Sequence, residues 1–348
     1  MFGNRWTFAG LLFIVLMAIA GILGYLIIPD QTPNANTMHL QLSNKKPGRT
    51  FKFLIISRAN KNAGSPIRRM LYGEDADFKS IPITSYRVSG GKVYARAYTG
   101  DDETGEEVQY PFTGKDNLYT QTFWLGTDIY GRDMLSRLIL GIRVSFSVGL
   151  VAVCISLLIG VSLGAVAGYF GGGADTMISW LTNVIWSLPS LLLVIAISFA
   201  LGKGFWQIFI AIGLSTWVDV ARLVRGQVMA LKQVEFVEAA RALGYSDARI
   251  IIRHILPNIA GPILVIASAN FAAAILLETG LSFLGFGAQP PVPSWGGMIR
   301  EHYGYIVMDA AYLAILPGLA IMLTVYAFNL LATGLRDSFD VRTQNVSV

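Results

Sequence analysis

Five stretches of this chain contain no Asp, Glu, Lys or Arg, and each is long enough to cross a lipid bilayer as a helix. They cover residues 6–29, 144–174, 176–202, 255–277 and 310–335. A helix needs about 20 predominantly apolar residues to span the hydrocarbon core of a bilayer. The whole chain is only 14% charged, whereas soluble globular proteins carry about 25% charged residues. These stretches therefore predict an all-α integral membrane protein.

A sixth span is predicted over residues 204–218 and their C-terminal extension. This stretch is short, and it reaches spanning length only when Asp219 and Arg222 are included. An arginine near the end of a span can place its guanidinium at the interface, so we include both. The first stretch contains Ala18-Ile19-Ala20, which resembles a signal-peptidase site, but apolar residues continue beyond it. We therefore predict a retained first transmembrane helix over residues 1–29.

Six spans place both termini on one side of the membrane, and the basic residues predict which side. Short cytoplasmic loops are enriched in Lys and Arg, whereas long segments cross the membrane largely regardless of their charge. Arg132, Arg137 and Arg143 lie on the expected outer side, but they follow such a long segment. The short outer loops hold Lys203 and Arg300. The inner side holds Arg5, Arg222, Arg225, Lys232, Arg241, Arg249, Arg253, Arg336 and Arg342, which predicts cytoplasmic termini and a cytoplasmic tail at 337–348.

Residues 30–122 differ from the rest of the chain because they carry 23 of its 49 charged residues. The stretches 51–56 and 86–94 are typical of strands, the second with a hairpin turn at Gly90-Gly91. We therefore predict a small β-rich extracytoplasmic domain, inserted after the first helix. Its acidic residues do not have the spacing of an EF-hand loop, which favours a solvated turn over a calcium site. These residues are Asp101, Asp102, Glu103, Glu106 and Glu107.

The segment 123–143 precedes the second span and contains both charges and an apolar helical face. Leu135, Leu138, Ile139 and Ile142 recur at helical spacing. This pattern predicts an interfacial helix whose arginines point toward lipid headgroups. Asp128 and Asp133 flank Arg132, and neither His nor Cys is close in sequence. We therefore expect these two aspartates to cap helices and form ion pairs rather than bind a metal.

The loop 230–257 is a charged segment between two apolar spans. Gly244 is placed to end a helix in a left-handed cap. Ser246 can cap a second helix that begins at Asp247, and Pro257 predicts a bend where the next span starts. In the first helix the apolar positions are Phe236, Ala239, Ala240 and Leu243, and the charged positions are Glu235, Glu238 and Arg241.

Two interpretations of this loop stay open on physical grounds. The caps could merely fold a surface loop. Alternatively, the small residues Ala239, Ala240 and Gly244 could let a cytosolic partner approach closely, and that partner would cover Phe236 and the isoleucines.

The spacing within the loop carries a resemblance to a known family. Glu238-Ala239-Ala240, three residues, Gly244, nine residues and His254-Ile255-Leu256-Pro257 resemble the EAA loop of ABC-importer permeases. His254, where the general form has Ile, is similar to the peptide/nickel branch. Three further stretches resemble the C-type permease of dipeptide and oligopeptide systems. They are residues 125–137, Gly168-Tyr169-Phe170-Gly171-Gly172, and residues 281–287 with Pro293-Ser294-Trp295-Gly296.

The resemblance implies a type I permease fold with a five-helix core at 144–336, in the bacterial inner membrane. It implies a homologous second permease, two cytosolic ATPases and an extracytoplasmic substrate-binding protein as partners, with peptides or similar solutes as cargo. The coupling loop would consist of Glu238, Ala239, Ala240, Gly244, His254, Leu256 and Pro257. The sequence contains no phosphate-binding loop of the Gly-x-x-x-x-Gly-Lys-Ser/Thr kind. We therefore expect no catalytic site, cofactor or metal in this chain, and ATP bound by the partner ATPases.

Three ionisable residues near the spans are candidates for the transport pathway or an inter-subunit contact. Asp219 and Arg222 are three residues apart, and we favour a pair on one helical face over substrate contact. Glu278 follows a long uncharged run, and an ionisable residue within a span is a functional candidate. For Glu278, the sequence favours neither an interface-facing or inter-subunit role nor a contact with substrate over the other.

Two other classes of protein remain as alternatives. An ion-gradient-driven carrier predicts inverted repeats and ionisable pairs at the midplane, and neither is clear. A membrane-anchored receptor or scaffold would use the 30–122 domain for binding. His39, His254 and His302 are far apart in sequence, and the aromatic residues lie in apolar runs rather than beside basic clusters. The sequence therefore favours neither a metal site nor a nucleic-acid partner.

Overall fold

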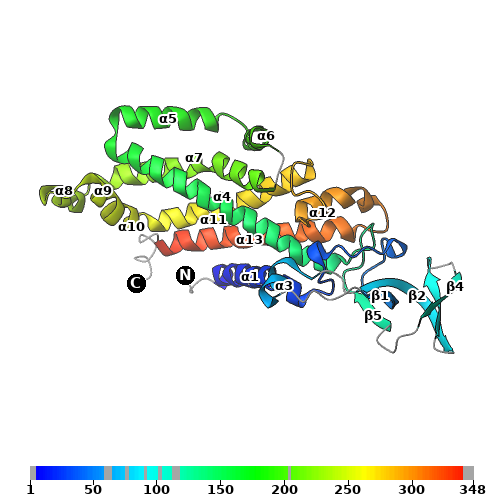
Figure 1. The fold of residues 1–348 in the computed structure, drawn as a ribbon. Coiled ribbons are helices and arrows are strands. Elements are labelled where there is room, and N and C mark those ends of the chain that lie inside the picture. Colours follow the sequence, from blue (N-terminus) through cyan, green and yellow to red (C-terminus); the bar gives the residue numbers. More distant parts are fainter. Residues whose placement is uncertain are drawn as a thin grey trace. The chain divides into compact units, whose positions relative to one another are not determined.

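A computed structural model describes residues 5–58, 65–74, 78–89, 92–100, 104–111, 118–202 and 205–339 (Figure 1). The chain divides into two compact units. The helical unit comprises residues 1–16, 145–289 and 319–348, and the sheet unit comprises residues 17–144 and 290–318. The turn at Gly90-Gly91, the acidic residues 101–103 and most of the tail at 337–348 lie outside the described residues.

The helical unit is built from long apolar helices. It contains the start of α1 (Arg5–Ile22), most of α4 (Met134–Phe170), α5 (Gly172–Trp186), α6 (Ser190–Leu201), α7 (Phe205–Leu231), α11 (Ala260–Phe283) and most of α13 (Tyr312–Phe339). Between α7 and α11 lie α8 (Glu235–Ala242), α9 (Asp247–Ile250), the π-helical turn η4 (Ile251–Ile255) and α10 (Leu256–Asn258). Among the described residues, five helices are long and apolar enough to cross a membrane, or six if α5 and α6 form one span.

The predicted span at 176–202 passes as long and apolar enough to cross a membrane only as a bent pair of helices. The structure breaks it between α5 and α6, which meet at 98°. Pro189 occupies the position before α6. Proline lacks a backbone N–H and restricts the residue before it, so a helix rarely continues through this position. The expected extension of the neighbouring span through Asp219 and Arg222 is present, because α7 runs without interruption from Phe205 to Leu231.

Three glycines allow α4 to pack closely on α7. A Cβ atom at Gly160 would lie 2.7 Å from the carbonyl oxygen of Trp217, and one at Gly164 would lie 2.5 Å from that of Ala221. A Cβ atom at Gly168 would lie 2.7 Å from the carbonyl oxygen of Arg225. Glycines repeated every fourth residue let two helix backbones approach in a membrane. The partner of this glycine face is therefore within the chain itself.

The sheet unit contains a five-stranded antiparallel sheet with the order β4-β3-β2-β1-β5. Strand β1 buries side chains on both faces, with Phe53 on one and Leu54 on the other. The strands are β1 (Arg49–Arg58), β2 (Phe78–Ser89), β3 (Lys92–Tyr98), β4 (Thr104–Pro111) and β5 (Leu118–Phe123). Short helical elements complete the unit: α2 (Gly24–Ile27), η1 (Pro33–Ala35), η2 (Leu40–Leu42), α3 (Pro66–Tyr72), α12 (Trp295–His302) and η5 (Tyr303–Val307).

The interfacial helix predicted at 123–143 is not a separate element of the structure. Residues from Met134 onward form the first turns of α4, without a break before the apolar stretch. Arg132 and Arg137 are each only 2% exposed and do not face outward as headgroup ligands would. They are instead buried beside Asp128 and Glu301. The prediction failed because Glu301 comes from α12, which is far away in sequence.

Candidate functional site

The turn between α8 and α9 has the left-handed cap expected at Gly244. Gly244 has φ of +77°, a conformation that costs glycine little because it has no Cβ. The Tyr245 N–H donates to the carbonyl of Ala240 at 3.1 Å, and the Gly244 N–H donates to that of Arg241 at 2.9 Å. These two hydrogen bonds form a Schellman motif, which satisfies carbonyls left free at the helix end.

The second helix of the loop is attached to the end of α4. Ser246 occupies the N-cap position of α9 with extended backbone, but its side chain makes no capping hydrogen bond. Instead, the Tyr169 hydroxyl donates to Asp247 Oδ1 at 2.6 Å. Pro257 follows the π-helical turn η4 and lies in α10, directly before α11 begins at Ala260. The loop is thus fixed to α4 at one point and continues into α11.

The loop residues divide into an inward and an outward set. Val237 and Ala240 are buried in a cluster with Val224, Val228 and Ile250. Leu256 packs against the same cluster, and the His254 ring stacks on Tyr245 with centroids 5.7 Å apart. The outward set is Glu238, Ala239, Gly244 and Pro257.

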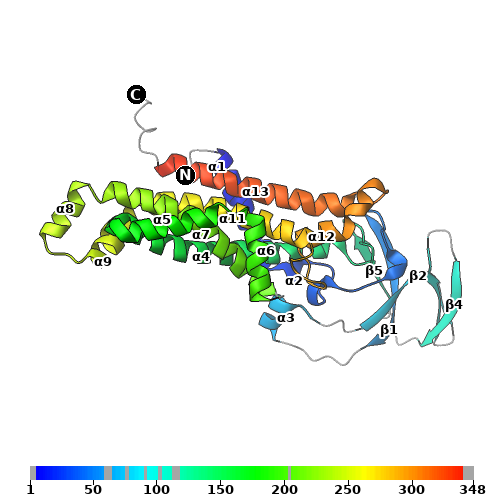
Figure 2. The same cartoon turned by 90° about the horizontal axis from the view of Figure 1, so that it is seen from above.

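The apolar face expected for α8 is therefore mostly exposed. Of its four predicted members only Ala240 is buried. Leu243 is 71% exposed and Phe236 is 37% exposed. Figures 1 and 2 show α8 and α9 together at one end of the helical unit. Exposed apolar groups rimmed by charges are typical of a surface that binds another protein.

A second polar group lies between α5 and α7. The Trp186 indole N–H donates to Asp219 Oδ1 at 3.2 Å. Arg222 donates to Asn183 Oδ1 at 2.8 Å, and its guanidinium lies 4.0 Å from the Trp186 ring centroid. Within the part of the chain that the structure describes, Asp219 and Arg222 form no ion pair, so the predicted pairing is wrong. Both side chains instead form hydrogen bonds with α5, Asp219 with Trp186 and Arg222 with Asn183.

Glu278 lies inside the helical unit. Its side chain is 2% exposed, and the Ser282 hydroxyl donates to Glu278 Oε1 at 2.6 Å. The turn at Gly287 packs directly on Ser282. This position is the interior of the unit rather than a surface that a solute could reach.

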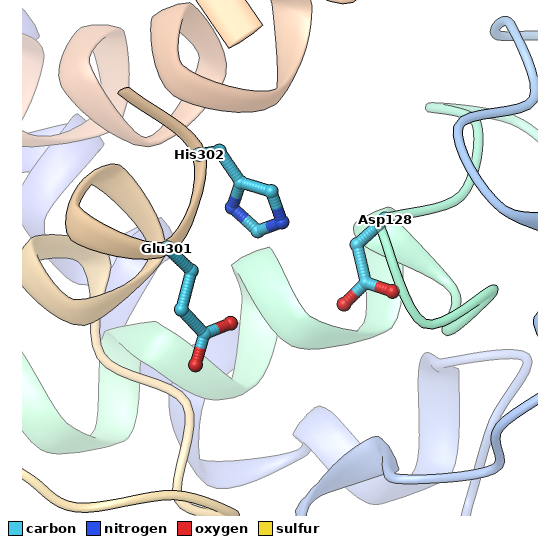
Figure 3. A group of neighbouring side chains, drawn as sticks. All are labelled: Asp128, Glu301 and His302. Atoms are coloured by element: carbon cyan, nitrogen blue, oxygen red, sulfur yellow. The ribbon is translucent and has the colours of Figure 1, made fainter. Parts of the chain in front are cut away.

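A buried polar cluster in the sheet unit was missed by sequence reasoning. Figure 3 shows the side chains of Asp128, Glu301 and His302 converging, and they offer one ligand atom each, within 4.8 Å of one another. Arg132 lies between the carboxylates. Its Nε is 2.5 Å from Asp128 Oδ2, and its Nη2 is 2.9 Å from Glu301 Oε2. Guanidinium groups already neutralise these oxygens, so the arrangement is an ion-pair network rather than a cation site.

Each aspartate of the segment before α4 has the role that the sequence predicted. Asp128 pairs with Arg132. Asp133 caps α4, because its Oδ2 accepts from the Ser136 N–H at 2.9 Å and from the Ser136 hydroxyl. Burial raises the pKa of the Asp133 carboxyl, and the charges of Asp30 and Asp128 add to this shift.

The long apolar helices are those of an integral membrane protein. The chain belongs to the family described as binding-protein-dependent transport system inner membrane component, whose model matches residues 160–345. Its members are transport subunits of ATP-driven importers in the inner membrane. They work with ATPase and substrate-binding partners and are not enzymes themselves.

Two relatives share more than two fifths of the aligned residues with this chain. The chain is 42% identical over 222 residues to the glutathione transport system permease protein GsiD of Pectobacterium atrosepticum, which covers 64% of this chain and 73% of that protein. Identity and coverage are the same for the dipeptide transport system permease protein DppC of Alkalihalophilus pseudofirmus. A solved chain of the inward-facing MetNI methionine ABC transporter gives a TM-score of 0.46 at 18% identity, covering 58% of this chain and 97% of that chain.

Proposed function

We propose that this chain is one of two permease subunits of an importer for short peptides, and that it is driven by separate ATPases through the loop at 238–257. The observation that carries this proposal is the outward surface of α8 and its glycine turn. Peptide cargo is supported by relatives named for glutathione and dipeptide transport. Six spans, with α5 and α6 as one bent span, would place both termini in the cytoplasm and residues 30–122 outside.

The construction of the loop supports a role in coupling. Glu238, Ala239 and Leu243 face outward, where a groove of an ATPase can receive them. The inward residues Val237 and Ala240 pack on α7, and Asp247 bonds to the end of α4. Since the close-packed interior transmits displacement rather than absorbing it, movement of the ATPases would move α4, α7 and α11 together.

The polar group between α5 and α7 is the part of the helical unit that we assign to the pathway. Asp219 is exposed and Arg222 is half-buried, so each can reach a solute. Their opposite charges suit the ammonium and carboxylate ends of a peptide. Trp186, which is 62% exposed, adds an aromatic surface beside them. Glu278 has no such access, and we assign it to the interior packing of α11.

The coupling proposal is tested in the assembled transporter, with its sister permease, ATPases and binding protein in proteoliposomes. The variant combines Leu243→Asp and Ala239→Arg, which change the outward face and leave Val237 and Ala240 in place. We expect the ATPases to stop co-purifying and ATP-dependent peptide uptake to be lost. The matched control is Ile67→Asp, at a position that is 69% exposed in the sheet unit, and it should retain both properties.

Two results would overturn the proposal. One is wild-type ATPase binding and uptake in the double variant. The other is uptake that an uncoupler abolishes and that ATP depletion leaves unchanged, which would indicate a carrier driven by an ion gradient.

A further inference from the structure

The sheet unit contains a cleft of about 780 Å³ that the transport mechanism above does not use. One wall is the segment from Pro29 to His39, and the opposite wall is formed by β1, β2 and β5. Asp133, at the start of α4, also lines it. Ligand sites for small molecules typically have volumes of about 300–1,000 Å³. The cleft is therefore large enough for a solute the size of an amino acid or a short peptide.

The segment wall is held in one conformation by Asp30. Its Oδ1 accepts from the N–H and hydroxyl of Thr32 and from the hydroxyl of Thr37, and its Oδ2 accepts from the Thr37 N–H. The same wall is fixed to the stretch before α4, because the His39 N–H donates to the carbonyl of Tyr130 at 3.1 Å. A cleft wall with this many internal hydrogen bonds is preorganised for binding.

Asp133 supplies an acceptor that has no partner. It is 2% exposed. Its Oδ2 is engaged by Ser136, whereas its Oδ1 is buried without a hydrogen-bond partner in the described structure. A buried polar atom left unpaired costs about 1–3 kcal/mol, so such atoms usually mark a missing donor. In this cleft a ligand can provide that donor.

The charges of the cleft favour an ammonium group as the donor. Asp30, Glu74 and Asp133 all line it. A metal ion needs several free oxygen ligands, but both Asp30 oxygens already accept hydrogen bonds, and Glu74 is paired with Arg69 at 3.1 Å. One free acceptor within a negative surface therefore fits a hydrogen-bonded ammonium better than a coordinated cation.

The remaining walls suit the other parts of an amino-acid-like ligand. Met38, Ile56 and Phe123 offer apolar surface for a side chain. Lys79 is exposed on β2 and lines the same cleft, where its ammonium can pair with a carboxylate.

We propose that this cleft is a binding site for amino acids or short peptides, with the ligand's ammonium group on Asp133 and its carboxylate at Lys79. The choice of peptides rests on the proposed transport function. The recognition of an ammonium group rests on the cleft alone. The site is distinct from the group formed by Asp219 and Arg222 in the helical unit.

Binding of radiolabelled Ala-Phe to the full chain in lipid nanodiscs tests the proposal. We expect saturable binding that weakens at least tenfold when the probe is N-acetyl-Ala-Phe. Asp133→Asn, which keeps an oxygen to cap α4, should weaken binding of Ala-Phe by a similar factor. Lys79→Gln should weaken binding of Ala-Phe but not of its C-terminal amide. The matched control is Glu106→Gln, an exposed acid on β4 outside the cleft, and it should bind like the wild type.

A second variant covers the case in which Asp133→Asn does not fold. Ile56→Trp fills the cleft from an exposed position of β1 and should abolish binding while leaving the melting temperature within a few degrees of the wild type. Three results overturn the proposal: no saturable binding to the wild type, equal binding of the N-acetylated probe, or binding that Arg222→Gln abolishes and the cleft variants leave intact.

Uptake by the assembled transporter separates this proposal from the transport function. If the wild type imports Ala-Phe and the cleft does not bind it, the transport function stands and the cleft proposal fails. If the cleft binds Ala-Phe and the assembled transporter does not import it, the cleft proposal stands and the transport function fails.

Discussion

At the scale of single residues, His302 is a buried imidazole whose surroundings disfavour the charged form. Its Nδ1 contacts the carbonyl of Met298 at 2.7 Å and therefore carries the hydrogen, while Nε2 has no partner in the described structure. Burial lowers the pKa of His302, although Asp128 and Glu301 act in the opposite direction and Arg132 adds to the effect of burial. The surrounding ion pairs thus do not compensate for the loss of water.

This lowered pKa predicts a loss of stability in acid. Because the folded-state pKa lies below the ordinary value of 6.5, the unfolded chain binds a proton first, and stability falls as the pH drops below 6.5. Each pKa unit corresponds to about 1.4 kcal/mol. We expect His302→Gln to lose less stability than the wild type between pH 7.5 and pH 5, as measured by thermal unfolding. Burial also lowers the pKa of His39, so His39→Gln should act in the same direction. Parallel pH profiles for wild type and His302→Gln would contradict the prediction.

Arg132 is the residue whose loss should destabilise the sheet unit most directly. Its replacement by Gln leaves Asp128, which is fully buried, without its closest cation. Breaking a buried pair costs about 3–5 kcal/mol, so the midpoint of chemical unfolding should fall clearly. Arg87→Gln is the control, because Arg87 is 69% exposed and lies 3.9 Å from Glu107, where a pair contributes about 0–1 kcal/mol. Equal effects of the two changes would contradict this account.

The same residues show how far local sequence predicts a site. The pairing of Asp128 with Arg132 and the cap at Asp133 follow from neighbours within four positions, and they are present. Glu301 joins the pair from 169 residues away, and spacing cannot indicate such a contact. The predicted pairing of Asp219 with Arg222 is wrong for the same reason. Their actual partners, Trp186 and Asn183, are brought to them only by the packing of α5 on α7.

At the scale of helices, the contact between α4 and α7 depends on glycines of α4, because they have no side chain. A Cβ at Gly164 would lie 2.5 Å from the Ala221 carbonyl oxygen and 2.9 Å from Val224 Cβ, so Gly164→Ala must push the helices apart. Inserting atoms into a packed contact costs about 1–3 kcal/mol. Gly226→Ala on α7 is the matched control, because nothing lies within 4 Å of its Cβ, and better helix propensity should stabilise it by up to about 1 kcal/mol.

Thermal unfolding in detergent distinguishes the two variants. A lower midpoint for Gly164→Ala together with an unchanged or higher midpoint for Gly226→Ala is the expected result. If both variants behaved alike, helix propensity rather than packing would explain the glycines.

Helix boundaries were predicted well where composition decides them and poorly where packing does. The uncharged stretches predicted the positions of α1, α4, α7, α11 and α13. The break before α6 follows from Pro189, a signal that is present in the sequence. The continuity of α4 from Met134 onward has another origin, because Arg132 and Arg137 are neutralised by Asp128 and by the distant Glu301 and do not need to face an interface.

At the scale of the whole molecule, the bent pair α5 and α6 decides the topology. If the pair crosses the membrane, the chain has six spans, and Gly173 and the coupling loop lie on the same side. If the pair enters and returns on one side, the chain has five spans, and α7 carries the coupling loop to the opposite side from Gly173. The number of spans and the side of the ATPase-binding loop are therefore one question.

Labelling of single-cysteine variants, made in a Cys154→Ser background, determines both the number of spans and the side of the loop. Glu106→Cys on β4, Gly173→Cys in the first turn of α5 and Ala248→Cys in α9 each replace an exposed residue. With a membrane-impermeant maleimide on intact cells, we expect labelling of Glu106→Cys alone, and of the other two only after permeabilisation. Labelling of Ala248→Cys but not Gly173→Cys in intact cells would establish five spans and remove the loop from the reach of cytosolic ATPases. Because the two outcomes differ at Ala248 alone, Gly173→Cys is the internal control for cell integrity in the same experiment.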